Sequence, residues 1–199
     1  EIDSAIKYKL GLPMGMLELQ DTLGGGSIDT QFHVMGYFGA TLGKSYGPAP
    51  ILTRLFKEGN YGKKTGKGYY DWSEGKTNEI PVNAGANFDP IRVLAPAVNQ
   101  AAYLIETKAT TREEIDTATL LGLNYPRGIL RMADSYGLDV IVAELKRLHE
   151  TYKAPRYRAS RVLTGLAEAQ VATQLGADPR SADYLARART RLAAIETAQ

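Results

Sequence analysis

The residues most suggestive of chemistry lie in a glycine- and lysine-rich run, Gly62-Lys63-Lys64-Thr65-Gly66-Lys67-Gly68. Backbone amides in such a run can cradle phosphate groups. The spacing fails the P-loop pattern, because Tyr61 rather than glycine stands five residues before Gly66 and no Ser or Thr follows Lys67. No β-strand pattern precedes the run. We therefore expect an ordered structural turn here, with phosphate binding as the alternative.

The other candidate motifs favour structural interpretations. Gly24-Gly25-Gly26 lacks the third spaced glycine and the βαβ setting of a dinucleotide site, so we expect a helix-breaking loop. Neither histidine has a partner at metal-ligand spacing. We expect His33 to be packed near Phe32. His149 is expected in the last turn of a helix, where its charge suits the helix dipole.

Three arginines, Arg156, Arg158 and Arg161, form a further cationic group. They could meet phosphates, but a solvated or salt-bridged face is the favoured interpretation. No Ser-His-Asp set, paired-carboxylate site or HExxH motif stands out, and the chain has no cysteine. The residues alone thus predict no catalytic residue, no metal ligand and no cofactor-binding residue in this chain.

Composition places the chain among ordinary soluble globular proteins. It has 199 residues, of which 44% are hydrophobic and 23% charged, with a net charge of +2. That charge gives no argument for nucleic acid as a partner. No apolar run approaches the roughly 18 residues that a membrane span needs. The first residues do not form a signal peptide, and the lack of cysteine fits a cytoplasmic protein.

The chain repeats itself. Residues 1–26 match residues 114–139 without a gap, an offset of 113 positions (114 minus 1). The identities include a Glu-Ile-Asp triplet, a proline, a glycine and an aspartate, at positions 1–3, 13, 15 and 21 in the first copy and 114–116, 126, 128 and 134 in the second. We interpret this pattern as an internal duplication.

The second copy is longer at its front. A helix is predicted from Asp89-Pro90 to about Lys108, and Thr111-Arg112-Glu113-Glu114 predicts a capping box that opens the next helix. Because Glu1 matches Glu114, the first copy begins inside that box and lacks the opening helix. We therefore expect the chain to be a fragment of a longer protein.

The predicted architecture is all-α, because the remaining periodic segments also have helical spacing. Residues 1–72 form the first repeat, truncated at its N-terminus, and residues 89–170 form the second. The polar stretch 73–88 is predicted to be a linker. Residues 171–199 are predicted to be a C-terminal helical extension whose role the sequence does not indicate.

The segment from Glu1-Ile2-Asp3 to Asp21 resembles the C-terminal signature of 3-hydroxyacyl-CoA dehydrogenases. That signature has an acidic residue followed by Ile-Asp, then Gly-Phe-Pro-Met-Gly-Pro-x-Glu-Leu-x-Asp. The run 62–70 resembles the family's Gly-x-Lys-x-Gly-x-Gly-Phe-Tyr ending. The second copy resembles the same domain through Pro96, Asn99 and the repeated positions, so that the resemblance covers about residues 1–170.

The resemblance implies two copies of a helical domain of the 6-phosphogluconate dehydrogenase C-terminal type, the first without its opening helix. It implies a parent enzyme that is an NAD-dependent 3-hydroxyacyl-CoA dehydrogenase of fatty acid β-oxidation or 3-hydroxybutyryl-CoA metabolism. In that family an N-terminal Rossmann domain binds NAD and supplies a His–Glu pair. The 3-hydroxyacyl-CoA substrate and that domain are therefore the expected partners, with a homo-oligomer also possible. The fragment itself is expected to be inactive.

By the same resemblance, Tyr8, Pro13, Met14 and Gly15 lie near the substrate cleft. Packing at the interface between the repeats is the alternative for these four residues. Tyr8 matches an aromatic substrate contact of some relatives, but Leu121 stands there in the second copy. The family's substrate-contacting asparagine lies on the missing opening helix. Its matching position in the second copy is Ile91, which predicts a structural pseudo-repeat.

A different class of function is also compatible with these residues. The chain could be a stand-alone helical assembly or binding module without catalysis. A βαβ region with a GxGxxG motif upstream of Glu1 would favour the enzyme, and an initiator methionine immediately before Glu1 would favour the module.

Overall fold

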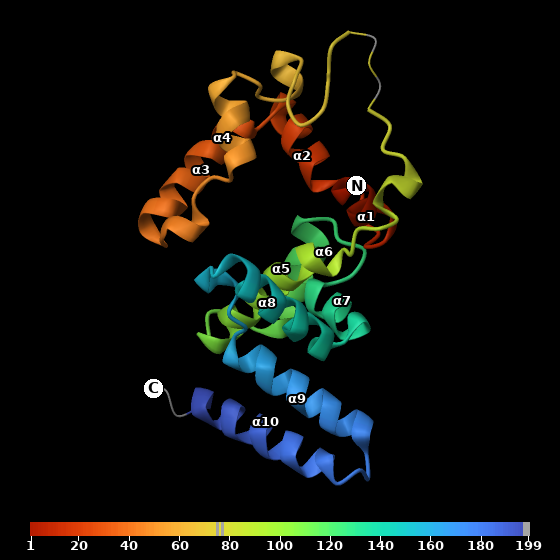
Figure 1. Cartoon of the computed structure of the whole chain (residues 1–199), viewed down its shortest axis with the longest axis vertical. Coiled ribbons are helices and arrows are strands. Elements are labelled where there is room, and N and C mark those ends of the chain that lie inside the picture. Colours follow the sequence, from red (N-terminus) through yellow and green to blue (C-terminus); the bar gives the residue numbers. More distant parts are fainter. Residues whose placement is uncertain (75, 77, 197–199) are drawn as a thin grey trace. The chain divides into compact units, whose positions relative to one another are not determined.

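The computed structural model describes residues 1–74, 76 and 78–196, and it confirms the all-α class (Figure 1). Among these residues the β-structure consists of two isolated bridges, Gly62 with Lys67 and Lys67 with Asp71. The chain separates into two compact units. Unit 1 comprises Glu1–Pro90 and unit 2 begins at Ile91. No helix of the described residues is long and apolar enough to cross a membrane.

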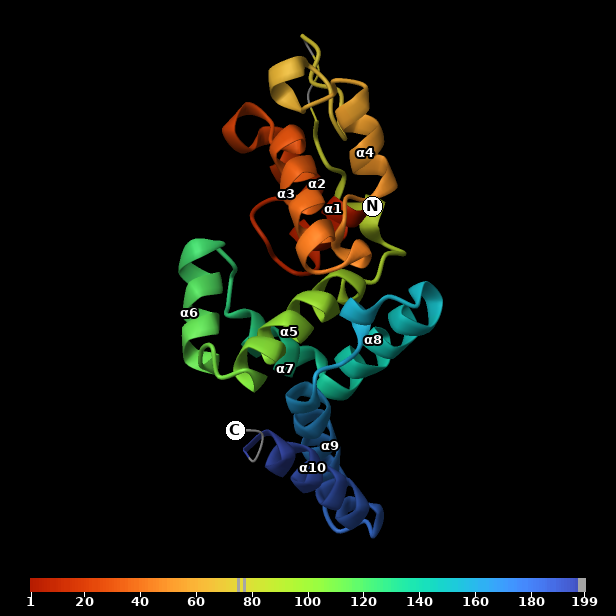
Figure 2. The ribbon, with the colours of Figure 1, turned by 90° about the vertical axis from the view of Figure 1, so that its left-hand side faces the viewer.

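Unit 1 contains short helices joined by tight turns. Its α-helices are α1 (Ile2–Tyr8), α2 (Met16–Thr22), α3 (Ile28–Thr41) and α4 (Pro50–Lys57), and its 3₁₀ turns are η1 (Leu23–Gly25), η2 (Lys44–Tyr46), η3 (Lys63–Thr65) and η4 (Val82–Gly85). Helices α3 and α4 lie side by side (Figures 1 and 2). Ile28, Leu52 and Leu55 are buried between them, with Phe32 and Tyr61 packed at the edge. Pro50 at the first turn of α4 suits that position because its missing N–H needs no partner there.

Part of the segment predicted as a linker folds onto α1. The Ser4 hydroxyl donates to the Val82 carbonyl at 2.8 Å and accepts from the Gly85 amide at 2.9 Å. The Tyr8 hydroxyl donates to the Ile80 carbonyl at 3.0 Å. A Cβ added to Gly85 would lie 2.5 Å from the nitrogen of Ala5, so η4 and α1 are in direct backbone contact. Residues 80–86 are therefore fixed within unit 1.

Unit 2 is built around one long helix. Its elements are α5 (Ile91–Glu106), α6 (Arg112–Gly122), α7 (Ile129–Tyr136), α8 (Leu138–Tyr152), the 3₁₀ turn η5 (Pro155–Tyr157), α9 (Arg161–Leu175) and α10 (Arg180–Glu196). Helix α5 continues through Pro96 and buries a stripe that includes Leu94, Val98 and Ala102. It packs against α7, α8 and α9. The predicted capping box of α6 is present, since Thr111 and Glu114 each bond the other's backbone amide.

Helices α9 and α10 form an antiparallel pair at the end of unit 2 (Figure 1). Gly165 lets them approach closely, because a Cβ there would lie 3.0 Å from Leu192. Arg187 and Arg191 of α10 both pair with Glu168 of α9, at 3.3 and 2.9 Å. The position between residues 170 and 171, where the sequence predicted an extension to begin, falls inside α9.

Candidate functional site

In each repeat a buried aspartate binds the loop that follows the helix in which it lies, α1 in unit 1 and α6 in unit 2. In unit 1 the Asp3 carboxylate is 1% exposed and accepts the amides of Leu17 and Glu18 at 2.9 and 2.7 Å. In unit 2 Asp116 accepts the amide of Leu130 at 2.8 Å. Leu130 is the residue that the repeat offset assigns to Leu17. The carboxylates thus bind the free amides and positive end of α2 and α7.

A glycine stands against each of these carboxylates. A Cβ on Gly15 would lie 2.2 Å from Cγ of Asp3, and a Cβ on Gly128 would lie 2.2 Å from Cγ of Asp116. Both distances are far below van der Waals contact, so only glycine fits without a shift of the loop. In unit 1 the Gly15 amide also donates to Glu18 at 3.1 Å, and Glu18 pairs with Lys7 at 3.1 Å.

A second buried aspartate organises the glycine- and lysine-rich run. Asp21 is fully buried and accepts the amides of Tyr69 and Tyr70 at 3.0 and 2.8 Å. The indole nitrogen of Trp72 donates to the same carboxylate at 2.9 Å. A Cβ on Gly68 would lie 2.2 Å from Oδ1 of Asp21. The run therefore wraps around an anion that belongs to the protein.

Tyr70 joins the two carboxylates into one network. Its hydroxyl donates to Oδ2 of Asp3 at 2.6 Å, while its amide donates to Asp21. Burial is the main cause that raises the pKa of Tyr70 far above its ordinary value, and the hydrogen bond to Asp3 adds to it. Tyr70 is therefore a proton-bearing donor throughout the pH range in which the protein would work.

This arrangement does not fit a phosphate group. The amides of Gly62, Thr65, Gly66 and Gly68 donate to backbone carbonyls, and those of Tyr69 and Tyr70 donate to Asp21. Lys64 binds Asp29 at 2.8 Å, and this hydrogen bond lowers the pKa of Asp29. The run is an ordered turn, as predicted, and the nearest buried charge is negative. The amides of Gly62, Thr65, Gly66, Gly68, Tyr69 and Tyr70 are therefore already engaged and not free to bind a pyrophosphate.

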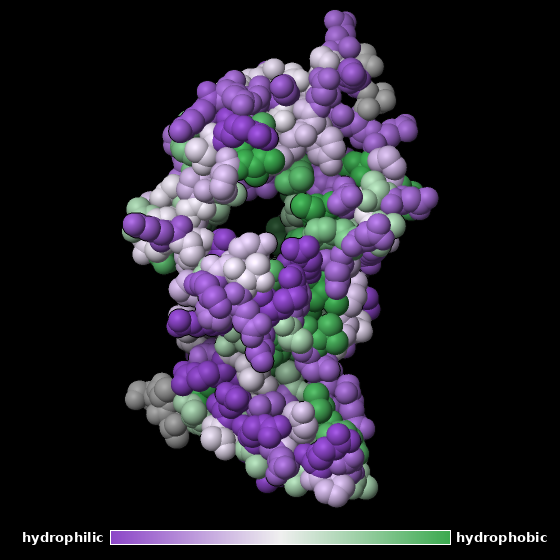
Figure 3. All heavy atoms as spheres, in the orientation of Figure 1, coloured by the Kyte–Doolittle hydropathy of each residue, from purple (hydrophilic) through white to green (hydrophobic). Residues whose placement is uncertain are grey.

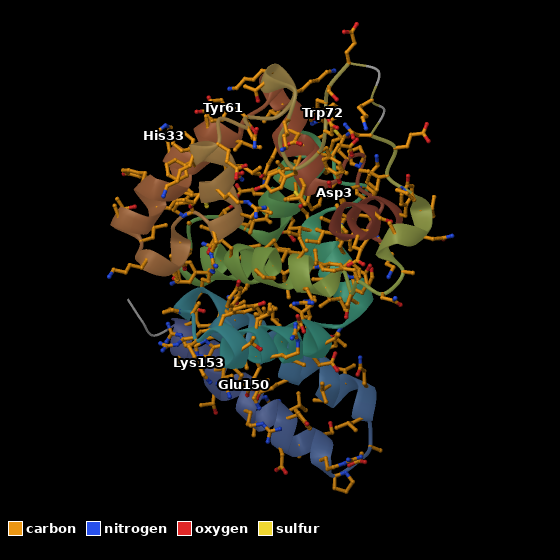
Figure 4. The ribbon with its side chains drawn as sticks, turned by 45° about the horizontal axis from the view of Figure 1, so that its top comes forward. Asp3, His33, Tyr61, Trp72, Glu150 and Lys153 are labelled. Atoms are coloured by element: carbon orange, nitrogen blue, oxygen red, sulfur yellow. The ribbon has the colours of Figure 1, made fainter. Side chains whose placement is uncertain are left out.

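The remaining candidates lie apart from this network. His33 lies on α3 with its side chain exposed (Figure 4). Its ring meets Phe32, as predicted, and Phe56, both edge-on, with centroids 5.7 and 5.2 Å apart. His149 lies in the last turn of α8, as predicted, and its Nδ1 lies 3.0 Å from the Ala154 carbonyl. Arg161 pairs with Glu106 at 2.8 Å, which supports the salt-bridged interpretation. Within the described residues no three His, Asp or Glu side chains are grouped as metal ligands.

Comparison with known proteins decides the family. The sequence model described as "3-hydroxyacyl-CoA dehydrogenase, C-terminal domain" matches residues 1–72 and 90–178, which is most of the chain. The chain belongs to this family. It contains two copies of the family's repeat signature, and the second match runs to residue 178, inside the segment predicted as an extension.

Individual relatives agree with that assignment. The chain is 30% identical over 200 aligned positions to a peroxisomal fatty acid beta-oxidation multifunctional protein of Arabidopsis thaliana, covering 83% of this chain and 26% of that protein. It is 34% identical over 101 positions to a 3-hydroxybutyryl-CoA dehydrogenase of Clostridioides difficile, covering 50% and 35%. The crystal structure of 3-hydroxybutyryl-CoA dehydrogenase from Escherichia coli K12 shares the fold, with a TM-score of 0.68, 22% identity and coverage of 83% and 53%.

The chain thus spans only part of the length of its relatives, from 26% to 53% of those named above. What it contributes is the family's C-terminal helical domain. Asp3, Asp21, Asp116 and Tyr70 organise the loops of that domain in this chain.

The four residues predicted to contact substrate occupy two places in unit 1. Tyr8 ends α1 with 48% of its surface exposed and its hydroxyl bound to the Ile80 carbonyl. Pro13 and Met14 lie in the loop between α1 and α2, with Pro13 exposed and Met14 half-buried. Gly15 is buried against Asp3. Asp3 therefore sets the position of the Pro13–Gly15 loop, and Ile91 opens α5 with 9% exposure.

The role of the buried carboxylates is what sequence reasoning missed. Asp3, Asp21 and Asp116 were recognised as repeated or signature positions, but not as ligands of backbone amides. Their local sequence gives one signal, because Asp3 and Asp116 are charged residues that share the buried face of a helix with apolar residues, Ile6 in α1 and Ile115 in α6. The contact of Asp21 with Tyr69, 48 positions away, has no local signal at all.

Proposed function

We propose that this chain is the C-terminal substrate-cleft and assembly region of an NAD-dependent 3-hydroxyacyl-CoA dehydrogenase, acting in fatty acid β-oxidation or 3-hydroxybutyryl-CoA metabolism in the cytoplasm. The observation that carries the proposal is the family match over both repeats, together with the Asp3 contacts that fix the signature loop. The relatives are named as dehydrogenases and β-oxidation proteins.

In this proposal the nucleotide chemistry belongs to another part of the parent enzyme. The family is NAD-dependent, and the glycine-rich run of this chain is closed around Asp21. A Rossmann domain would bind NAD and supply the acid–base residues, and this chain would add the second wall of the cleft. The purified chain is accordingly proposed to be inactive with 3-hydroxyacyl-CoA and NAD.

The loop Pro13–Gly15 and Tyr8 are the proposed substrate wall. Met14 offers a flexible apolar side chain to an acyl group, and it is partly accessible. Gly15 contributes by its close approach to Asp3, which fixes the loop. In the intact enzyme, the substrate would either replace the Ile80 carbonyl as the hydrogen-bond partner of the Tyr8 hydroxyl or contact the exposed face of the Tyr8 ring.

The test joins this chain to the nucleotide-binding domain and opening helix of a 3-hydroxybutyryl-CoA dehydrogenase and measures steady-state kinetics. Met14→Ser is expected to raise KM for long acyl chains about three- to tenfold, because it removes apolar contact worth about 1 kcal/mol. Tyr8→Leu, which installs the residue found at position 121, is expected to raise KM as well. Leu121→Ala is the matched control and should leave KM unchanged. Unaltered KM for both unit 1 variants, with normal folding, would contradict the assignment of the cleft.

A further inference from the structure

Positive charge is concentrated where α8 ends and α9 begins. Residues 146–161 hold six lysines and arginines against one acidic residue, Glu150, which gives a formal net charge of +5, whereas the whole chain carries +2. All six cationic side chains are exposed. Hydrophilic side chains, drawn purple in Figure 3, accordingly gather over the end of α8 and the turn η5. The remainder of the chain is net negative, so the positive charge of the protein comes from this segment.

Within the described residues, two of the six cations have acidic partners and four do not. Arg147 pairs with Glu144 at 2.6 Å, and Arg161 pairs with Glu106 at 2.8 Å. The cations without an ion pair to any described residue are Lys146, Lys153, Arg156 and Arg158. Like charges at such close spacing repel one another, and a bound anion would relieve that repulsion. We call residues 153–158 the cationic loop.

Two tyrosines accompany the charges. The ring centroids of Tyr152 and Tyr157 lie 5.8 Å apart, and the guanidinium of Arg156 lies over the Tyr157 ring, 5.1 Å from its centroid. Tyr152 is 56% exposed, so its ring keeps an open face. The cationic loop thus places a flat aromatic surface beside several positive charges. Aromatic rings that stack a base next to cations that bind phosphates are the usual means of holding a nucleotide.

The backbone that carries these side chains is held in place by unit 2. The amide nitrogen of Asn99, in α5, donates to the Arg158 carbonyl at 2.8 Å, and its Oδ1 accepts the Ser160 amide at 2.8 Å. The Ala154 carbonyl lies 3.0 Å from Nδ1 of His149. These contacts use main-chain atoms of the segment and leave its cationic side chains to a ligand. Because the loop is already ordered, a ligand loses less free energy on binding to it.

The fold of the repeat does not require these charges. Unit 1 has the same succession of helix, 3₁₀ turn and helix in α3, η2 and α4. When the two turns are aligned on the tyrosine that ends each of them, the positions of Arg156 and Arg158 are occupied by Ser45 and Gly47. An uncharged turn thus connects the corresponding helices of unit 1. The cations of unit 2 therefore serve something other than the folding of the repeat.

The limited extent of the charge favours a small ligand over a nucleic acid strand. In α10, the next arginine-rich element, three of the four arginines are already paired: Arg187 and Arg191 with Glu168, and Arg180 with Asp178. The unpaired cations therefore do not continue as a track along α10. A nucleic acid strand binds along such an extended basic track. A compact chain of phosphates instead brings several negative charges within reach of one loop.

We propose that the cationic loop of unit 2 is a binding site for a nucleoside triphosphate. Lys153, Arg156 and Arg158 pair with the phosphates, and the base stacks on the open face of Tyr152. NAD is not a ligand of this loop, because it lacks a terminal phosphate and its nicotinamide cation offsets part of its negative charge. The inference is independent of the dehydrogenase activity and is tested on the chain by itself.

The first test titrates ATP into the intact chain by calorimetry, at low salt and without divalent cations. We expect saturable one-to-one binding that weakens as salt is added. The double variant Arg156→Gln/Arg158→Gln should weaken it at least about tenfold, because charge-assisted contacts to the phosphates are lost. Both side chains are exposed, so the variant should keep its fold. Arg54→Gln/Arg189→Gln, which removes the same charge at exposed positions on α4 and α10, is the matched control and should bind ATP as the parent does.

The second test separates the base from the phosphates. Tyr152→Leu should weaken the binding of ATP about fivefold, because the stacked base loses its platform, and should leave the binding of inorganic triphosphate unchanged. Glu150, labelled with Lys153 at the end of α8 in Figure 4, is the acidic residue of this segment. Glu150→Gln should tighten the binding of both ligands about twofold, because it removes an exposed like charge near the phosphates.

Three results would overturn the proposal. The first is the absence of ATP binding. The second is ATP binding that survives Arg156→Gln/Arg158→Gln, or that the matched control weakens equally, since the cationic loop would then not be the site. The third is inorganic triphosphate or a short oligonucleotide that binds more tightly than ATP, since the ligand would then be a phosphate chain alone or a nucleic acid strand.

Discussion

At the scale of single residues, the fold of unit 1 depends on carboxylates that are buried and fully engaged. Asp3 accepts two amides and the Tyr70 hydroxyl, and Asp21 accepts two amides and the Trp72 indole. Burying a charge is costly, and several charge-assisted hydrogen bonds offset that cost. Removing one donor leaves a buried acceptor short of a partner, so these positions should tolerate little change.

Tyr70→Phe tests the link between the two carboxylates. The variant deletes the hydroxyl that donates to Asp3 and should lower the free energy of unfolding by about 1.5–3 kcal/mol, the range for hydrogen bonds to charged groups. Urea denaturation monitored by circular dichroism measures the change. Tyr37→Phe is the control, because Tyr37 is 66% exposed and should change stability little. Equal stabilities for the two variants would show that the Tyr70 hydroxyl bond contributes nothing.

Gly15→Ala and Gly128→Ala test the close approach of the loop to each aspartate. Either methyl group would collide with the carboxylate, so each variant should destabilise its unit by about 1–3 kcal/mol, as overpacking does. Gly36→Ala is the matched control. Position 36 lies inside α3 with open space around it, so alanine should stabilise by about 0.5–1 kcal/mol. The idea fails if Gly15→Ala is as harmless as Gly36→Ala.

At the scale of elements, the long-range contacts of a few polar side chains fix the helices in place. Glu106 at the end of α5 accepts the Arg161 and Val162 amides and the Arg161 guanidinium. Partial burial alone would raise the pKa of Glu106. The hydrogen bonds from Arg161 and Val162 outweigh that effect and lower the pKa below its ordinary 4.5.

Glu106→Gln should therefore show a pH-dependent loss of stability. A carboxyl whose pKa is lower in the folded state adds stability above its unfolded value and loses it as pH falls through the folded value. The variant should be less stable than the parent by about 1–2 kcal/mol at neutral pH. The difference should shrink below pH 4.5. Thermal midpoints at a series of pH values measure it.

Glu150→Gln is the control for that series. Glu150 is exposed on α8, and no ion pair of it is present in the described residues (Figure 4). Its replacement should leave the pH profile of the parent unchanged. A Glu106→Gln difference that stays constant from neutral to acid pH would show that the ionised carboxylate is not what anchors α9.

The helices were predictable because their apolar residues recur at a spacing visible within each segment. The stripe Leu94, Val98 and Ala102 gave α5, and Thr111 with Glu114 gave the start of α6. Residues 80–86 were predicted to be part of a linker, but they are fixed on α1. The sequence could not show this, because the segment contacts α1 mostly through its backbone carbonyls, which every residue type has. Ser27 precedes α3, but its hydroxyl donates to the Gln20 carbonyl and does not cap the helix. Pairings over tens of positions have no local signature.

At the scale of the whole molecule, the chain is a family domain in two copies whose surfaces differ. The sequence identified the duplication and the family, since spaced signature residues recur in order. It did not indicate how far individual side chains differ between the copies, such as Leu19 at 38% exposure and Met132 at 1%, because burial depends on which elements pack against each residue. We expect no calorimetric signal for NAD with the purified chain, because its glycine-rich run is closed around Asp21. Micromolar binding of NAD would contradict this reading of the run.

The most direct measurement is the rate of NADH formation from 3-hydroxybutyryl-CoA and NAD, for the chain alone and for the chain joined to the nucleotide-binding domain and opening helix of a relative. The account predicts no turnover by the chain alone and turnover by the joined protein. Circular dichroism and NAD binding verify that the joined protein is folded. Turnover by the chain alone, or a folded, NAD-binding joined protein that produces no NADH, would contradict the proposal that this chain completes a dehydrogenase.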